Sequence, residues 1–65
     1  MTKAPEHHRR AAKHLRTAAD HHEEAAKAHE AGDPASAEQS TQLAAEHMDE
    51  ASEEHDKAEK AAEEE

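Results

Sequence analysis

The sequence predicts an all-α fold: an antiparallel helical hairpin with heptad repeats that dimerises into a four-helix bundle. Residues with a high helix propensity (Ala, Glu, Lys, Arg and Gln) dominate the composition. One short stretch, HEAGDPAS, contains the only glycine together with a proline, and so marks a single turn. On both sides of this turn the sequence repeats every seven residues, with Ala and His on one face.

The first helix is expected over residues 5–31. From Glu6 the chain divides into EHHRRAA, KHLRTAA, DHHEEAA and KAHEAGD, with His in the second or third place of every segment. At 100° per residue, places two, three, six and seven fall within an arc of about 140°. That face holds every His and most of the Ala, whereas places one, four and five hold nearly all the charged residues. This division is typical of an amphipathic helix with one broad packing face.

A tight turn is expected at residues 32–33. Gly32 can adopt the left-handed conformation that ends a helix. Asp33 can cap the following helix, and Pro34 suits the first helical position. These residues therefore connect two helices that lie side by side and run in opposite directions.

The second helix is expected over residues 34–59. From Gln39 the seven-residue pattern continues as QSTQLAA, EHMDEAS and EEHDKAE, with a weaker His signal than in the first helix. The acidic tail, residues 60–65, is expected to fray because Glu is unfavourable at the C-terminus of a helix. The whole chain, residues 1–65, then forms one hairpin domain.

Places three and six form the expected centre line of each packing face. In the first helix this line consists of His8, Ala11, Leu15, Ala18, His22, Ala25 and His29. In the second helix it consists of Ala37, Thr41, Ala44, Met48, Ala51, His55, Ala58 and Ala62. A strict repeat of seven predicts a left-handed supercoil. If the numbers of facing residues add to about 66, each large residue faces an alanine, as close helix packing requires.

Charge is distributed unevenly along the chain. Residues 1–19 carry a balance of +4 and residues 39–65 a balance of −8, so antiparallel packing brings opposite charges together. The net charge of −9 disfavours nucleic acid and anionic membranes as partners. No hydrophobic run approaches the length of a membrane span or a signal-peptide core. We therefore expect a soluble, cytoplasmic protein; a periplasmic location is compatible with the same features if an export segment has been removed.

The apolar residues are too small to build an ordinary core. They amount to 32% of the chain and consist of seventeen Ala, two Leu and two Met. Ordering one residue costs roughly 1.5 kcal/mol, whereas burying one methyl group returns only about 0.8 kcal/mol. Helix propensity, a bound metal, or association into a homodimer or higher homo-oligomer must therefore supply the missing stability. The absence of cysteine excludes disulfides and thiolate metal sites.

The eight histidines are candidate metal ligands, because a His-rich composition points to metal binding. Histidines seven residues apart on a helix are separated by about 10.5 Å, so one helix does not easily supply two imidazoles to one ion. The preferred cross-helix pairs are His8 with His55 and His22 with His47, and His7 and His14 are expected at the edge of the face. Carboxylates one turn away add the pairs His21 with Glu24, His47 with Glu50 and His55 with Glu59. Such mixed sets suit Cu(II), Ni(II) or Zn(II) better than Mg(II) or Ca(II).

A competing interpretation treats each histidine as a polar filler of a helix interface, which limits the number of chains that associate. Catalysis is not expected. The Glu-x-x-His motif of di-iron bundles and the His-Glu-x-x-His motif of zinc proteases are both absent. No Cys and few Ser or Thr residues leave no convincing arrangement for a nucleophile.

The HHxxAA heptads, EHHRRAA and DHHEEAA above all, and the AKAHEAGD turn resemble the bacterial histidine-rich helical-hairpin proteins related to small metal-binding protein. The resemblance implies a helical bundle that binds copper and other divalent metals, for storage or buffering. It covers the first helix well and the second poorly, where only His47 and His55 occur. Carried over by position, it implies these ligands: His7, His8, His14, His21, His22 and His29.

Two hypotheses follow for function. The first is buffering or storage of a divalent transition metal by His on the helix faces, with His29, Glu50 and Glu59 in the candidate ligand set. The second is a non-catalytic structural module: a self-associating bundle, or a hydrophilic stress protein, whose His fill the interface. Circular dichroism with metal and with chelator distinguishes the two.

Overall fold

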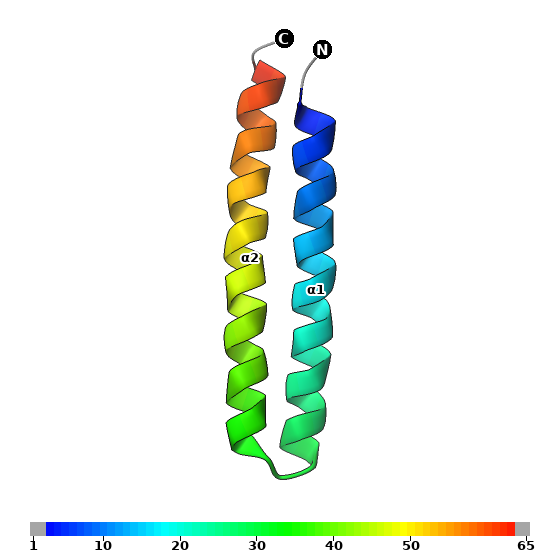
Figure 1. Ribbon diagram of the computed structural model, residues 1–65, viewed down its shortest axis with the longest axis vertical. Coiled ribbons are helices and arrows are strands. Elements are labelled where there is room, and N and C mark those ends of the chain that lie inside the picture. The colour runs from blue at the N-terminus through cyan, green and yellow to red at the C-terminus, as the bar shows by residue number, and fades with distance from the viewer. Residues whose placement is uncertain (1–2, 64–65) are drawn as a thin grey trace.

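The computed structural model describes residues 3–63 as two helices packed against each other (Figure 1). Helix α1 spans Ala4–Glu30 and helix α2 spans Pro34–Glu63, and no strand occurs among the described residues. The helices run antiparallel, so that both chain ends lie at one end of the molecule and the turn at the other (Figure 1). The predicted all-α hairpin is confirmed. Within residues 3–63, neither helix has a stretch that is both long and apolar enough to cross a membrane.

The turn ends α1 and begins α2 through hydrogen bonds of the backbone and of one carboxylate. Gly32 has a φ of 74°, the left-handed conformation predicted for it. The N–H of Asp33 donates to the Ala28 carbonyl at 2.8 Å and that of Gly32 donates to the His29 carbonyl at 3.1 Å, which satisfies the exposed end of α1. The Asp33 carboxylate accepts the N–H of Ser36 at 3.1 Å and so caps α2, as predicted. Hydrogen bonds from the Ser36 side chain and backbone hold the Asp33 pKa below its ordinary value.

Helix α2 was predicted to reach about residue 59 or beyond, and the structure places its end at Glu63. It continues to Glu63, so the fraying expected from residue 60 onward is not seen over residues 60–63. Ala58 is fully buried, Ala61 is half-buried, and both lie on the side of α2 that faces α1. Lys60 in the last turn is cationic and interacts favourably with the negative C-terminal end of the helix dipole. Residues 64–65 of the expected tail lie outside the described residues.

Alanine alone forms the buried core of the described chain. The buried side chains recur every seven residues on each helix: Ala4, Ala11, Ala18 and Ala25 on α1, and Ala37, Ala44, Ala51 and Ala58 on α2. A methyl group is the smallest side chain that still buries apolar surface, so these two columns let the helix backbones approach closely. No larger side chain among residues 3–63 is fully buried. The hairpin is therefore thin, with Cα extents of 51 × 12 × 9 Å.

The predicted centre line is correct for place six and wrong for place three. The second column of the helix interface is place two, whose residues are half-buried: His7, His14, His21 and Ala28 on α1, and Ser40, His47, Glu54 and Ala61 on α2. The predicted place-three residues are almost all exposed, including Leu15 at 54% and Met48 at 43%. Place two contains a carboxylate, Glu54, opposite a histidine, whereas place three offers no such pair. Each helix therefore turns its polar column, and not its large apolar residues, toward its partner.

The register of the hairpin is close to the predicted one. Contacts across the interface join residues whose numbers add to 61 for His7 and Glu54, and to 68 for His21 and His47. The predicted sum of about 66 lies between these two values. The antiparallel prediction thus places the correct parts of the two helices side by side. It does not identify the individual residues that are in contact.

Candidate metal centre

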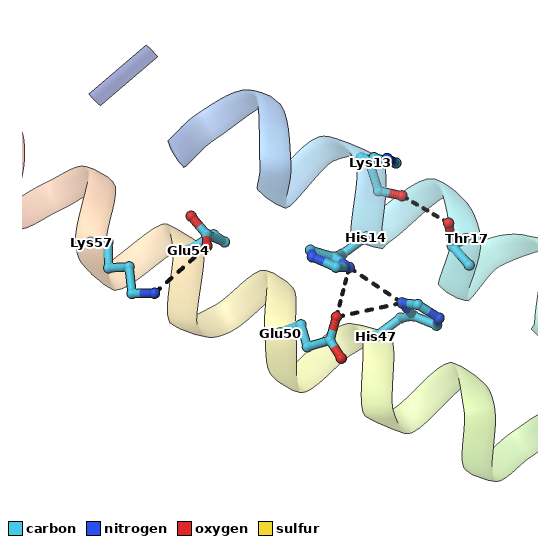
Figure 2. A network of polar contacts seen from close by, with 7 residues as sticks. All are labelled: Lys13, His14, Thr17, His47, Glu50, Glu54 and Lys57. Atoms are coloured by element: carbon cyan, nitrogen blue, oxygen red, sulfur yellow. Dashed lines mark hydrogen bonds and ion pairs between the residues drawn. The ribbon is translucent and has the colours of Figure 1, made fainter. Parts of the chain in front are cut away.

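Three side chains that can ligate a metal meet at the middle of the hairpin (Figure 2). The Nδ1 atoms of His14 on α1 and His47 on α2 are 3.3 Å apart. The Oε2 atom of Glu50 lies 2.9 Å from the Nδ1 of His14 and 3.8 Å from the Nδ1 of His47. Two imidazoles and one carboxylate from two helices therefore converge on a single point, which we call the His14 centre.

Local sequence explains this convergence. His14 lies between the buried Ala11 and Ala18 of α1, so small residues above and below it let α2 come near. His47 lies between buried alanines of α2 in the same way. Glu50 follows His47 by three residues and so lies one turn away on the same side of α2. The alanine column thus brings the polar column of each helix within reach of the other.

The spacing of the three donor atoms suits a transition metal. A tetrahedral ion with ligand bonds of 2.0–2.1 Å separates its donors by about 3.3 Å, which the 2.9, 3.3 and 3.8 Å separations bracket. Imidazole favours zinc, copper and nickel, and a carboxylate completes such a set. The side chains of His14 and His47 are 28% and 27% exposed, and that of Glu50 is 50% exposed. An ion and its remaining water ligands can therefore enter from solvent.

A third histidine, His21, lies next to the centre along the interface. The ring of His47 is stacked between His14, at 5.5 Å between centroids, and His21, at 5.6 Å. The Nδ1 of His21 lies 3.2 Å from Oε2 of Glu24, and the Ser40 hydroxyl donates to the same oxygen at 3.5 Å. These contacts hold the His21 ring against His47 and restrict the direction in which His47 can turn. His21 therefore orients a ligand of the centre without joining it.

His7 makes a different contact, with a carboxylate alone. Its Nδ1 lies 2.6 Å from Oε2 of Glu54, and the two side chains are only 16% and 13% exposed. The Nζ of Lys57 lies 3.7 Å from the other oxygen of Glu54. The hydrogen bond with His7, together with the positive charges of Lys57, His7 and Arg10, lowers the pKa of Glu54 from its ordinary value of 4.5. This hydrogen-bonded pair closes the interface near the chain ends.

The structure brings only some of the candidate ligands together. His14, His47 and Glu50 meet, so the expectation that His14 is an edge residue is wrong, as it is for His7. His22 is exposed, and His14 and His21 take the place beside His47 that was predicted for it. His8 and His55 line one shallow groove on another face, where His55 Nε2 lies 2.9 Å from Glu59 Oε1. His29 is exposed near the turn.

Sequence reasoning missed Glu54 and the role of place two. It centred the interface on places three and six because these lie in the middle of the arc that holds the histidines and most of the alanines. The available signal was the alanine of place six, which recurs in every complete heptad except the one that contains Gly32 and so marks the closest approach of the helices. If place six is taken as the centre of the helix interface, either place two or place three can form the column beside it. Place two is favoured because it puts a carboxylate opposite a histidine. Glu54 would then have been paired with His7.

Comparison with protein-family models gives no match, and neither the curated proteins nor the solved structures contain a significant match to this chain. The candidate centre is therefore judged on its own geometry and chemistry.

Proposed function

We propose that the hairpin binds a divalent transition metal, Cu(II), Ni(II) or Zn(II), at the His14 centre and serves to buffer or store it without catalysing a reaction. The observation that supports this most directly is the approach of two imidazole nitrogens to 3.3 Å, with a carboxylate oxygen near both. Neutral imidazole and carboxylate together form a donor set that these ions prefer. The resemblance to histidine-rich helical hairpins supports the same class of function.

Metal binding at this centre is linked to folding. His14 belongs to α1 and His47 belongs to α2, so both imidazoles reach one ion only when the helices are docked. An ion that binds only the folded chain, at a hundred times its dissociation constant, adds about 2.7 kcal/mol to the free energy of unfolding. The alanine core contributes little by comparison per residue, since one buried methyl group supplies about 0.8 kcal/mol. We further propose that the folded unit is a homodimer in which two hairpins form a four-helix bundle.

Titration of the full chain with each ion, followed by calorimetry and circular dichroism, tests the proposal. His14→Gln with His47→Gln should weaken binding by at least tenfold and remove most of the metal-induced rise in melting temperature. The matched control is His22→Gln with His29→Gln, which removes two exposed histidines and should change affinity little. Equal losses in the two double variants would contradict a specific centre.

A structural module without metal is the second candidate, and one observation favours it. His7 and Glu54 are paired at 2.6 Å, so a histidine of the interface can be satisfied by a carboxylate alone. If all four interface histidines act in this way, the hairpin should be fully helical in chelator. Added Cu(II), Ni(II) or Zn(II) should then leave its melting temperature unchanged.

A further inference from the structure

One face of the hairpin carries mainly uncharged residues, chiefly alanine and histidine with Leu15 and Met48, and has no partner in the single chain. It is formed by places three and seven of both helices and includes a shallow groove lined by His8, Ala12, Leu15, Met48, Ser52 and His55. Leu15 and Met48 are exposed, at 54% and 43%, although they are the largest aliphatic side chains near the middle of the hairpin. The His14 centre lies on the opposite side of the helix interface. We call the groove side the apolar face.

The position of the apolar residues around each helix indicates what covers this face. In a four-helix bundle each helix packs against two neighbours, and the directions to these neighbours are at right angles. The residues that point to the bundle axis therefore lie between the two contact faces of the helix. Places two and six of each helix form the hairpin contact. The apolar face begins at place three. Around the helix, place three lies 60° from place six, on the side opposite to place two. Places three and six, which hold both Leu15 and Met48 and all eight buried alanines of the described residues, would then face the axis of a four-helix bundle.

Charges at the outer rims of the apolar face fit a second copy of this chain. Place four flanks the face on the side away from the hairpin interface. Toward the open end of the hairpin it holds Arg9 and Arg16 on α1 and Asp49 and Asp56 on α2, all of them exposed. Nearer the turn it holds Glu23 and Glu30 on α1, which are level with the uncharged Gln42 and Ala35 on α2. The antiparallel register sets Arg9 level with Asp56, and Arg16 level with Asp49, but on opposite outer sides of one hairpin. Within one chain they therefore cannot pair.

A two-fold axis parallel to the helices brings these charges together. It places α1 of one copy over α2 of the other at the same level, so that Arg9 meets Asp56 and Arg16 meets Asp49 twice over. A two-fold axis perpendicular to the helices at mid-length would instead place Arg16 beside Arg16 and Asp49 beside Asp49. Like charges at that distance repel, so the parallel axis is favoured. Leu15 and Met48 of both copies then meet in one layer at the centre.

We propose that the apolar face is the interface of a two-fold homodimer with its axis parallel to the helices, and that His8 and His55 of both copies form a four-imidazole metal site inside it. His8 and His55 line the same groove from opposite helices, so each copy contributes one pair at one level. The two-fold axis sets the pairs face to face. The Leu15 and Met48 layer lies about 10.5 Å away along the bundle and shields that side of the site from water.

This interface site differs from the His14 centre in its chemistry and its dependence on association. Four imidazoles without a carboxylate leave the ion its full positive charge, which suits Zn(II) in a tetrahedral site or copper. Glu59, 2.9 Å from His55, can accept the N–H of the ring nitrogen that does not bind metal. The interface site exists only in the dimer, whereas the His14 centre is complete within one chain. The inference therefore stands or falls independently of the function proposed for the His14 centre.

Charge reversal on the full chain tests the interface. Arg16→Asp alone and Asp49→Arg alone should each raise the dimer dissociation constant at least tenfold in sedimentation equilibrium, and the two together should restore it. Lys13→Asp and Glu46→Arg make the same charge changes at exposed positions away from the apolar face and should have little effect. A double variant that dimerises no better than either single variant overturns the parallel axis. A wild-type chain that stays monomeric at millimolar concentration overturns the interface itself.

Zinc titration at a concentration where the chain is dimeric tests the metal site. His8→Gln with His55→Gln should remove about one bound Zn(II) per dimer, while the ions at the two His14 centres remain. His14→Gln with His47→Gln should have the complementary effect and leave the interface ion in place. The monomeric Arg16→Asp variant, with all eight histidines intact, should also lack the interface ion. Unchanged stoichiometry in the His8 and His55 variant rules out the interface site, whatever happens at the His14 centre.

Discussion

Glu54 has a different environment from the other acidic residues of α2. It lies in the helix interface, where its carboxylate meets His7 at 2.6 Å and Lys57 at 3.7 Å and is only 13% exposed. The other carboxylates of α2 lie in exposed positions, as Glu53 does next to it. A carboxylate held in this way favours its charged form, and its pKa is lowered. Protonation of the Glu54 carboxylate is therefore coupled to the packing of α2 against α1.

This coupling predicts acid sensitivity. Because the folded pKa of Glu54 lies below its ordinary value of 4.5, the carboxylate stabilises the fold above that value and loses its contribution as the pH falls through the folded pKa. We expect the melting temperature to drop below about pH 4.5 in wild type, and Glu54→Gln to flatten that part of the profile. Glu53→Gln, at an exposed position, should leave the acid dependence intact. Thermal melts followed by circular dichroism from pH 6 to 3 measure both.

At the scale of residues, the sequence alone predicts the site in part. His14, His47 and Glu50 are all candidates from composition and spacing, and the pair of His47 with Glu50 follows from a separation of one turn. The identity of the second imidazole does not follow. A shift by one place around the helix exchanges His22 for His14 and His21, and the sequence pattern does not resolve such a shift because histidine occupies places two and three alike.

At the scale of elements, the two alanine columns set how closely α1 and α2 approach. Ala37, Ala44 and Ala58 are completely inaccessible to solvent. A column with a methyl group every seven residues has no space for a longer side chain unless the helices separate. The polar contacts beside these columns, His14 with Glu50 and His7 with Glu54, depend on that close approach.

Enlarging one alanine should therefore disturb both packing and the candidate centre. Ala44→Leu is expected to destabilise the hairpin by about 1–3 kcal/mol, because overpacking forces the backbones apart. It should also weaken metal binding at the His14 centre, since His47 lies one turn away. Ala35→Leu, at an exposed position of α2, is the control and should change neither. Denaturant unfolding and metal titration of the two variants provide the comparison.

The turn gives a second prediction at this scale. Gly32 has a φ of 74°, and a Cβ added there would meet nothing within 4 Å. A side chain at position 32 is therefore disfavoured only by the left-handed backbone conformation, which costs a residue other than glycine about 1 kcal/mol. Gly32→Ala should lower the melting temperature by about 4–8 °C. Gly32→Asn should lower it less, because Asn tolerates the left-handed conformation better. A melting temperature that Gly32→Ala leaves unchanged would mean that the turn contributes nothing to stability.

The elements follow from the sequence more closely than the site does. Gly32, Asp33 and Pro34 each have one strong conformational preference, so the turn and the start of α2 are predicted correctly. The end of α2 is predicted less closely. The helix continues past residue 59 with Ala58 buried and Ala61 half-buried against α1, and these tertiary contacts outweigh the unfavourable position of Glu at a helix C-terminus. Local preferences do not contain that information.

At the scale of the whole molecule, the eight histidines and the net charge of −9 make the state of the protein depend on pH. Protonation of all eight changes the formal charge to −1. Imidazole in peptides titrates near 6.5, and a nitrogen that ligates a metal must be deprotonated. Protonation of the histidines therefore removes most of the net negative charge and the imidazole ligands together.

Metal affinity should fall steeply between about pH 7 and 5 for this reason. Calorimetry with Ni(II) or Zn(II) at several pH values, in buffers with different ionisation enthalpies, measures both the affinity and the protons released. We expect proton release to be greatest at the acidic end of this range and to decrease in the His14→Gln with His47→Gln variant. Affinity that stays constant from pH 7 to 5 would exclude histidine as a ligand.

The placement of Ala4 and Glu63 at the same end of the hairpin determines how the molecule responds to a pulling force (Figure 1). A force that separates these ends opens the helices like a zipper, beginning at the pair of His7 and Glu54 and moving toward the turn. Each step breaks only a few small contacts, so resistance should be low and nearly even along the hairpin. An ion that joins His14 to His47 would stop the opening at mid-length. Single-molecule extension should then show one metal-dependent step in a chain that otherwise opens smoothly.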